Sequence, residues 1–384
     1  MGKSVENIVA DTFLDIAKGL ETGNFGTAPK IALTGMGSEH GEENAMAAAV
    51  AAAKEGIDVF YIGSLKNDAV TTIKVKDDEE GHKKMEEMVA SGEVDGAVTM
   101  HFPFPIGVST VGRVVTPANG KEMFIATTTG TSSADRIEGM IKNAIYGIIA
   151  AKACGIENPS LGILNVDGAR QGEMALRELA EGGYSINFAQ SSRADGGIVM
   201  RGNDVLQGTP DIMVCDSLTG NILIKMMSAY TSGGSFEATG YGYGPGIGKD
   251  YNNLVGIISR ASGAPLITNA IKYMAAVVRG GITNIAKEEF AKAEAAGLSK
   301  ILDERKADSA NAAQSTEEVE APPSEVVTEQ IAGIEIMDLD NAVQALWKEK
   351  IYAESGMGCT GPIVLVSKAN IDAAKKILGD LKFI

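Results

Sequence analysis

The sequence predicts an α/β fold, a three-layer sandwich built on a largely parallel sheet. Short apolar runs alternate with longer helical segments through most of the chain, and glycine-containing turns separate them. Parallel strands need a crossover helix between them, so this alternation is typical of α/β proteins. A length of 384 residues and a content of 45% hydrophobic residues suit two or three domains with large cores.

The elements follow in order from the N-terminus. A helix is expected over residues 5–20, where apolar side chains share one helical face, and Gly23 ends it. A strand at 31–34 leads through a glycine turn at 35–41 into an alanine-rich helix at 42–55. The later expected elements are a charged helix at 76–89 and apolar strands at 59–62, 94–99, 123–128, 161–166 and 212–215.

The composition is acidic, with a net charge of −16 and a pI of about 4.8. No basic face suits a nucleic acid, so no nucleic-acid partner is expected. The N-terminus lacks the pattern of a signal peptide, and no apolar run approaches a membrane span. Three widely spaced cysteines give no CxxC pair, which fits a reducing cytoplasm. No cluster has metal-ligand spacing, so no metal is expected.

The composition changes after residue 306. Residues 307–330 carry six acidic side chains, no basic one and two adjacent prolines, which is typical of a flexible linker. The domains are therefore expected to be a core of two subdomains at 1–306, this linker, and a C-terminal module at 331–384. The module shows a β-α-β-α pattern at 333–337, 341–352, 362–367 and 370–381. It is marginally small for independent folding, so we expect it to dock on the core or on a partner.

The glycine-rich motif Gly-Met-Gly-Cys-Thr-Gly-Pro occupies residues 356–362. It places Cys359 on a tight loop before an apolar strand, where backbone N–H groups could surround the sulfur. Such groups lower the pKa of a thiol and stabilise an oxyanion formed on it. A small buried side chain in a tight turn is the alternative interpretation of Cys359. The other two cysteines lie in apolar surroundings, with Cys154 at a helix end and Cys215 in the core.

Two stretches offer an anion site. Residues 127–133 (TTTGTSS) lie between a strand and a helix that begins near Asp135, and hydroxyls and N–H groups at a helix start bind anions. The candidates there are Thr129, Gly130, Thr131, Ser132 and Ser133. The alternative is plain N-capping by one of the two serines.

The second stretch, residues 211–225, is an apolar strand that delivers Asp216 to its carboxyl end and a helix that carries Asn221 and Lys225. Ligands of open α/β sheets bind beyond the carboxyl ends of strands. His40, at a helix start, could be a base, a cap or a surface residue, and His101 could line a pocket or simply close a loop. Residues 233–248 hold seven glycines and could form a lid, a dimer arm or a disordered loop. The 35–41 turn lacks GxGxxG spacing, so a dinucleotide site is not favoured.

A resemblance joins these segments. Residues 158–165, 187–188, 204–208 and 211–225 resemble, in order, segments of the phosphate acyltransferase (PlsX-like) family, whose fold is similar to those of isocitrate dehydrogenases and phosphate acetyltransferases. The whole chain, with its acidic linker and its Cys359 module, resembles α subunits of component C of glycine/sarcosine/betaine reductase complexes. The family's N-terminal Asp-Ala-Met-Gly-Gly-Asp is replaced here by Thr34–Glu39, and its acidic pair by Val166-Asp167-Gly168, which argues against a fatty acyl carrier as substrate.

The resemblance implies a role in acyl transfer. Component C receives a two-carbon unit from the selenoprotein component A, holds it as an acetyl thioester, and releases acetyl phosphate when phosphate attacks. The implied partners are component A and a thiolase- or ketoacyl-synthase-like β subunit, in an oligomer, with inorganic phosphate as co-substrate and no bound cofactor. Cys359 is the expected thiol. Lys225 and the 129–133 segment are the expected phosphate site, with Arg170 and Arg193 as further candidates.

Two rival functions stay open. A free-standing phosphate acyltransferase would use thioesters on coenzyme A or on a carrier protein, and Cys359 would then be dispensable. A non-catalytic scaffold would only position a partner subunit that carries the thiol.

Overall fold

The computed structural model describes residues 9, 12–14, 16, 17, 20, 28–193, 196–305, 319–334, 338–358, 361–381 and 383–384. They belong to two compact units. The first comprises Met1–Leu164 and Ile186–Lys292, and the second comprises Asn165–Ser185 and Ala293–Ile384. The predicted boundaries at residues 306 and 330 stay a prediction. Most of the expected helix at 5–20 lies outside the described residues.

A single mixed sheet forms the centre of the first unit, in the order β3-β2-β1-β4-β12-β11-β5-β6-β10-β7-β8, with β9 beside β7. The strands are β1 Lys30–Thr34, β2 Asp58–Gly63, β3 Thr71–Lys74, β4 Gly96–Thr99, β5 Val108–Val115, β6 Glu122–Thr131, β7 Ser160–Leu164, β8 Asn187–Phe188, β9 Val199–Met200, β10 Ile212–Val214, β11 Gly244–Ile247 and β12 Val255–Ile257. Both flanks are parallel, and β11 and β5 join them through antiparallel pairs. The predicted α/β fold with a largely parallel sheet is confirmed.

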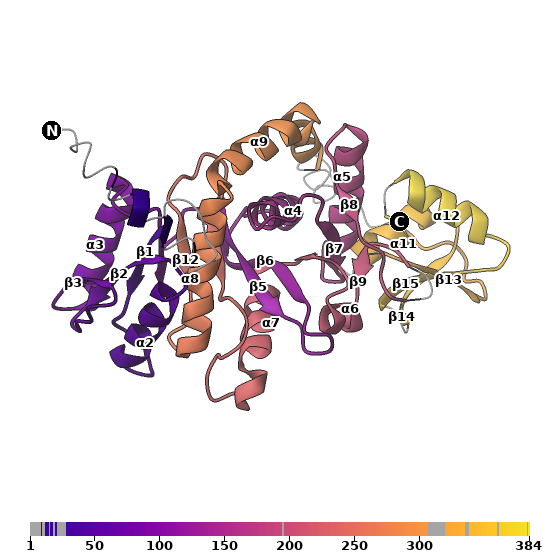
Figure 1. The fold of residues 1–384 in the computed structure, drawn as a ribbon. Helices are drawn as coiled ribbons and strands as arrows, with labels where there is room; N and C mark the ends of the chain where they lie inside the picture. Colours follow the sequence, from indigo (N-terminus) through magenta and orange to yellow (C-terminus); the bar gives the residue numbers. More distant parts are fainter. Residues whose placement is uncertain are drawn as a thin grey trace. The chain divides into compact units, whose positions relative to one another are not determined.

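Helices cover both faces of this sheet. They are α2 Glu42–Ala53, α3 Asp78–Ser91, α4 Arg136–Ala153, α6 Gly202–Gln207, α7 Ser217–Ala229, α8 Ala264–Arg279 and α9 Ile282–Ala295, the last of which crosses the boundary between the units. Helices α4 and α7 lie on opposite sides of β5 and β6 (Figure 1). Helix α4 is buried along nearly its whole length, as its continuous apolar sequence requires.

Three differences from the sequence prediction involve antiparallel pairing. Strand β5 (VSTVGRVV) was not expected. Strand β6 runs to Thr131, beyond the expected end at 128, because Val108 of β5 pairs with Thr131. Gly244–Ile247, within the glycine-rich segment interpreted as a lid, is the central strand β11. A Cβ at Gly244, which has φ +84°, would lie 1.7 Å from the Val111 carbonyl oxygen, so only glycine permits this close strand pairing. The lid hypothesis is therefore wrong for this part of the segment.

The second unit contains α5 Ala169–Glu181, a helix at 298–305 and the C-terminal module. The module consists of β13 Glu329–Ala332, α11 Leu339–Lys348, β14 Ala353–Gly358, β15 Gly361–Val366 and α12 Ile371–Asp380. Its sheet is antiparallel in the order β13-β15-β14. The sequence prediction therefore missed one strand of the module, β14. Its sequence, AESGMG, contains too few apolar residues to indicate a strand. Strand β13 also begins inside the expected linker.

The module has its own hydrophobic core, and a hydrogen bond joins it to α5. Apolar side chains such as Leu346, Val364 and Leu378 are fully buried between its sheet and its helices. Gln171 Nε2 of α5 donates to Asp338 Oδ2, just before α11, at 2.7 Å. This contact is consistent with the docking that the small size of the module predicts.

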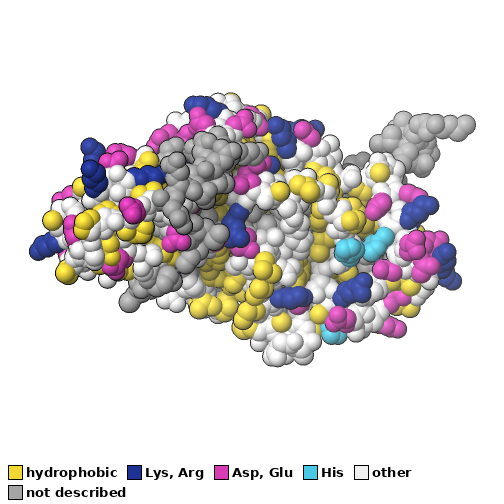
Figure 2. All heavy atoms as spheres, turned by 180° about the vertical axis from the view of Figure 1, so that it is seen from behind, with side chains coloured by type: hydrophobic (Ala, Val, Ile, Leu, Met, Phe, Trp, Pro, Cys, Tyr) yellow, Lys and Arg dark blue, Asp and Glu magenta, His cyan; other side chains and the backbone are white. Residues whose placement is uncertain are grey.

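The described surface carries mixed charges. On the face in Figure 2, Lys and Arg side chains are scattered among Asp and Glu, and hydrophobic side chains gather toward the middle. None of the described helices combines the length and the apolar character that a membrane span requires.

Candidate functional site

A cleft of about 510 Å³ lies at the carboxyl ends of strands in the first unit. Its wall comes from the segments that follow β4 and β12, from the second half of β6, and from one face of α7. The lining residues are Glu39, Met100, His101, Phe102, Phe104, Thr129, Gly130, Asn221, Lys225, Tyr243, Ile257, Ile258, Ser259 and Arg260. This is the edge of an α/β sheet where ligands bind, and the volume suits a small-molecule site.

Helix α7 carries the cleft's lysine. Asp216 begins the helix, because its carboxylate accepts hydrogen bonds from the amide and the hydroxyl of Thr219 at 3.0 and 2.6 Å. Gly220 lets α7 pack tightly on β6, since a Cβ there would lie 1.8 Å from the Thr127 carbonyl oxygen. Two turns into the helix, Lys225 lines the cleft with a side chain that is 52% exposed.

The Lys225 ammonium is held by two groups. It donates to Glu237 Oε1 at 3.0 Å and to Ser259 Oγ at 3.2 Å. It also lies 5.9 Å from the centre of the Tyr243 ring, within the range of a cation–π contact. An ammonium has three N–H donors, so one remains for a ligand in the cleft.

Only the beginning of the 129–133 segment reaches the cleft. Thr129 and Gly130 line it, but the Thr129 amide already donates to Thr110 Oγ1 at 3.0 Å. Asn221 also lines the cleft, and its Nδ2 donates to the Thr128 carbonyl at 3.1 Å. Four residues predicted from the sequence thus line the same cleft: Lys225, Asn221, Thr129 and Gly130. Their role in binding a ligand stays a prediction.

The helix start that was expected to bind an anion is built differently. Helix α4 is capped by Asp135, whose Oδ1 accepts from the Glu138 amide at 2.7 Å. Capping by Ser132 or Ser133 is thus wrong. Ser132 is buried and donates to the Gly139 carbonyl, and Ser133 Oγ accepts from the Asp135 amide at 3.1 Å. Together with Thr131, an exposed residue at the end of β6, they do not line the cleft.

The remaining candidates are elsewhere. Asp216 is the helix cap described above. His40 Nε2 lies 3.2 Å from the Ala261 carbonyl oxygen, an acceptor that requires a proton on this nitrogen, so Nε2 is engaged as a donor. Arg170 pairs with Glu173 at 2.9 Å in the second unit. Arg193 follows β8 in the first unit and does not line the cleft.

The sequence did not predict several residues at or beside the cleft, and it left the role of one other open. Ser259 and Arg260 follow β12, a three-residue strand too short to be recognised. The signal was present as an apolar run, Val255–Ile258 with one glycine, that ends in two polar residues. Glu237, which pairs with Lys225 but does not itself line the cleft, lies in the glycine-rich segment, where nothing in the local sequence marks a buried carboxylate. His101 lines the cleft, which is one of the two roles that the sequence left open for it.

The described cysteines are poor nucleophiles. Burial raises the pKa of Cys154 to about 11 and raises the pKa of the fully buried Cys215 further above its ordinary value. A thiol with a raised pKa holds little thiolate at neutral pH. Cys359, the predicted nucleophile, lies outside the described residues, between β14, which ends at Gly358, and β15, which begins at Gly361.

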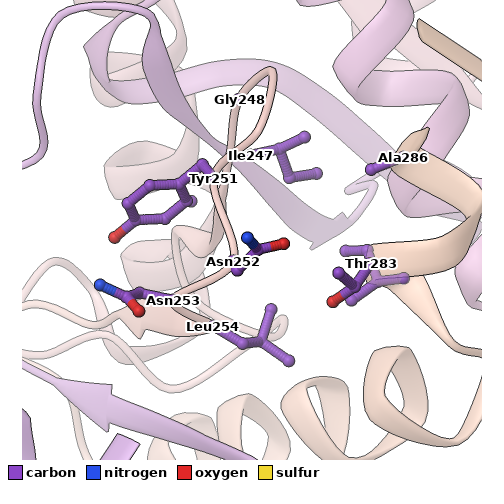
Figure 3. A pocket seen from close by; sticks show the side chains of 10 residues that line it. Ile247, Gly248, Tyr251, Asn252, Asn253, Leu254, Thr283 and Ala286 are labelled. Atoms are coloured by element: carbon purple, nitrogen blue, oxygen red, sulfur yellow. The ribbon is translucent and has the colours of Figure 1, made fainter. Parts of the chain in front are cut away.

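A second hollow is too small for a substrate. It holds about 20 Å³ beside the loop that follows β11, and Figure 3 shows Tyr251, Asn252 and Thr283 around it. This is room for about one water molecule. Among the described residues, no three His, Cys, Asp or Glu side chains group so as to hold a metal ion.

The chain is similar in sequence to a family model and to several known proteins. The family model described as fatty acid synthesis protein matches residues 29–365. The chain is 56% identical over 378 residues to the "Glycine/sarcosine/betaine reductase complex component C subunit alpha" of Peptoclostridium acidaminophilum, covering 98% of both chains. It is 28% identical to a phosphate acyltransferase of Bacillus cereus over 237 residues, which cover 52% of this chain and 70% of that one.

Solved structures also resemble it. One is the EutD phosphotransacetylase from Staphylococcus aureus, with a TM-score of 0.44 and 14% identity over 70% of this chain and 98% of that chain. The match of the family model over most of the sequence shows that the chain belongs to the family described as fatty acid synthesis protein, and the full-length similarity shows that the component C α subunit is a relative.

Proposed function

We propose that this chain is the acyl-transferring α subunit of component C in a glycine, sarcosine or betaine reductase complex, and that it forms acetyl phosphate. The observation that supports this most strongly is a lysine-bearing cleft at the carboxyl edge of the sheet in a chain that is 56% identical to such a subunit along its whole length. The similarity to a phosphate acyltransferase supports the same class of reaction.

In the proposed reaction, Cys359 holds the acetyl group as a thioester. An oxygen of inorganic phosphate attacks the carbonyl carbon, the C–S bond breaks, and the proton lost by phosphate goes to the departing thiolate or to solvent. The products are acetyl phosphate and free Cys359. Phosphate is the co-substrate, and no step draws on a bound cofactor.

The cleft supplies suitable groups for phosphate. Lys225 and Arg260 offer cationic donors, and Asn221 adds an amide, although Asn221 Nδ2 is engaged with the Thr128 carbonyl. Charge-assisted donors of this kind bind phosphate oxygens strongly. They also compensate locally for the strongly acidic character of the chain, whose net charge of −16 repels anions.

Chemistry and the burial of the other two cysteines support the proposed thiol. The reaction needs an ionisable thiol, and burial raises the pKa of both described cysteines. Cys359 is the third cysteine of the chain, in a glycine-rich motif whose backbone N–H groups would favour the thiolate. The acidic segment between the core and the module would let the thiol travel between the acetyl donor and the phosphate site.

Partner subunits are part of the proposal. The chain would act with a β subunit of component C and with the selenoprotein component A, in an oligomer in the cytoplasm. A stripe of large apolar side chains on α7 and the turn after it is consistent with membership of an assembly, since such exposed stripes mark contacts between proteins. Its members, each close to half exposed or more, are Leu218, Ile222, Met226 and Tyr230.

Reconstitution of the complex tests the proposal. The subunits are supplied with substrate, with and without inorganic phosphate, and acetyl phosphate is measured. The proposal expects release that requires both phosphate and Cys359. Activity of the isolated chain with acetyl-coenzyme A that survives Cys359→Ser would instead identify a free-standing phosphate acyltransferase. Full activity of the complex with a Lys225→Ala, Cys359→Ser double variant would identify a scaffold.

A further inference from the structure

Glu237 is a buried carboxylate beside the cleft's lysine. Its side chain is 3% exposed. Oε1 accepts hydrogen bonds from Lys225 Nζ at 3.0 Å and from the Tyr243 hydroxyl at 3.1 Å. Oε2 is buried and has no hydrogen-bond partner among the described residues. Buried polar oxygens nearly always have a hydrogen-bond partner, so an unsatisfied one is unusual.

The backbone holds this carboxylate in place. The Glu237 amide donates to the Ala261 carbonyl at 3.0 Å, and the Gly263 amide donates to the Glu237 carbonyl at 2.8 Å. Glu237 and Ser262 also form a parallel β-bridge. Glu237 is therefore fixed to the turn that follows β12, the same turn that presents Ser259 and Arg260 to the cleft.

We propose that Glu237 is a positioning residue that acts through Lys225 and weakens phosphate binding in the cleft; the inference rests on the function proposed above. The carboxylate and Ser259 hold the ammonium in one orientation at the cleft wall. The negative charge of Glu237 also offsets part of the lysine's charge, so phosphate and acyl phosphate meet a weaker field. A site that binds its anionic product less tightly releases it faster.

Another buried carboxylate serves as a matched control. Glu289 is also 3% exposed, and its Oε1 accepts from Lys152 at 2.9 Å and from Lys292 at 2.8 Å. None of these three residues lines the cleft. Glu289→Gln therefore removes a buried, lysine-paired charge from the same unit without touching the cleft.

The test measures inorganic phosphate in two ways: binding to the purified chain by calorimetry, and the phosphate dependence of acetyl phosphate formation by the reconstituted complex. Glu237→Gln keeps the shape of the side chain and removes its charge. We expect the Kd and the KM for phosphate to fall about 3- to 10-fold, the effect of one charge at about 6 Å and an effective dielectric constant of about 40–80. We expect kcat to fall, because the ammonium is less firmly oriented.

A double-variant cycle separates positioning from a merely structural role. In a Lys225→Ala background, Glu237→Gln should still lower the phosphate Kd, because the charge effect does not require the lysine, but it should no longer lower kcat, because the orienting effect does. Glu289→Gln should lower the melting temperature and leave the phosphate Kd as in the wild type. If Glu237→Gln fails to fold, Tyr243→Phe provides the reverse test. It removes one donor from Oε1, strengthens the pair with Lys225, and should raise the phosphate Kd.

The outcomes are distinct. An unchanged phosphate Kd in Glu237→Gln overturns the charge effect, and the same fall in kcat with and without Lys225 overturns the positioning role; in both cases the proposed function stands. Wild-type protein that shows neither saturable phosphate binding nor phosphate-dependent product contradicts the proposed function, and the inference falls with it.

Discussion

Replacement of Lys225 by alanine should weaken phosphate use far more than it weakens folding. The lysine supplies the ammonium of the cleft and is 52% exposed, so removing its side chain leaves no dry cavity in the core. The loss of one charge-assisted hydrogen bond to phosphate costs about 1.5–3 kcal/mol. That corresponds to a rise in the phosphate KM of roughly 10- to 150-fold.

The loss of folding free energy in Lys225→Ala should be smaller than the loss of phosphate binding, because Glu237 keeps one hydrogen-bond donor. Glu237 loses its cation but keeps the Tyr243 hydroxyl as a donor. Exposure of Lys225 also lets solvent screen the pair, which places the loss of folding free energy at about 1 kcal/mol. Lys152→Ala is the matched control, since Lys152 pairs with the equally buried Glu289 at 2.9 Å but lies away from the cleft.

The assay is acetyl phosphate release by the reconstituted complex over a range of phosphate concentrations, with thermal unfolding of each variant alongside. Lys225→Ala should show a large rise in phosphate KM and a small fall in melting temperature. Lys152→Ala should leave the phosphate KM unchanged and lower the melting temperature only modestly, since Glu289 keeps Lys292 at 2.8 Å. If Lys225→Ala keeps the wild-type phosphate dependence, the lysine does not bind phosphate and the site lies elsewhere.

Three further predictions concern the scaffold. Although burial alone raises its pKa, hydrogen bonds from two backbone amides and two serine hydroxyls lower the pKa of Asp204 to about 2. Asp204→Asn should therefore lose about 2.5 kcal/mol of folding free energy at neutral pH. The wild type should lose this stability as pH falls from about 4 to 2, and chemical unfolding across that range should show a flatter profile for the variant. Cys154→Ser and Cys215→Ser should lower the melting temperature and preserve acetyl phosphate release; loss of release in a well-folded variant would give one of them a chemical role. Gly220→Ala should destabilise the chain and raise the phosphate KM together, because its Cβ would meet the Thr127 carbonyl and push α7 off β6. A variant with wild-type Tm would contradict the packing account.

The sequence predicts the strands and helices whose signals are local. Strands β1, β2, β4, β6, β7 and β10 follow from apolar runs in the sequence, whereas β3, β5, β8 and β9 were not predicted. Lys225 could be placed at the sheet edge because β10 and α7 are adjacent in the chain. The middle of the sheet is different. Strands β11 and β12 are short and rich in glycine, and they are strands only because distant segments pair with them.

The candidate site shows the same division. Asn221, Lys225, Thr129 and Gly130 lie in contiguous motifs and were found. Glu237 and Arg260 were missed because their positions depend on long-range contacts, such as the bond between the Glu237 amide and the Ala261 carbonyl. The N-cap of α4 could not be predicted, because Asp, Ser and Thr residues all cap helices well and Ser132, Ser133 and Asp135 lie close together. Which of them precedes the first turn depends on where β6 ends.

The covalent role of Cys359 is the central claim, and mass spectrometry of the chain during turnover tests it most directly. The reconstituted complex is given substrate without phosphate, and the chain is digested and mapped. The account predicts one acetyl group on the peptide that contains Cys359, its loss when phosphate is added, and a matching amount of acetyl phosphate. It also predicts that Cys359→Ser folds with a near-wild-type melting temperature, carries no such thioester and releases no acetyl phosphate. Acetyl phosphate formed at the wild-type rate by Cys359→Ser, or by wild-type chain that never carries the adduct, would contradict the account.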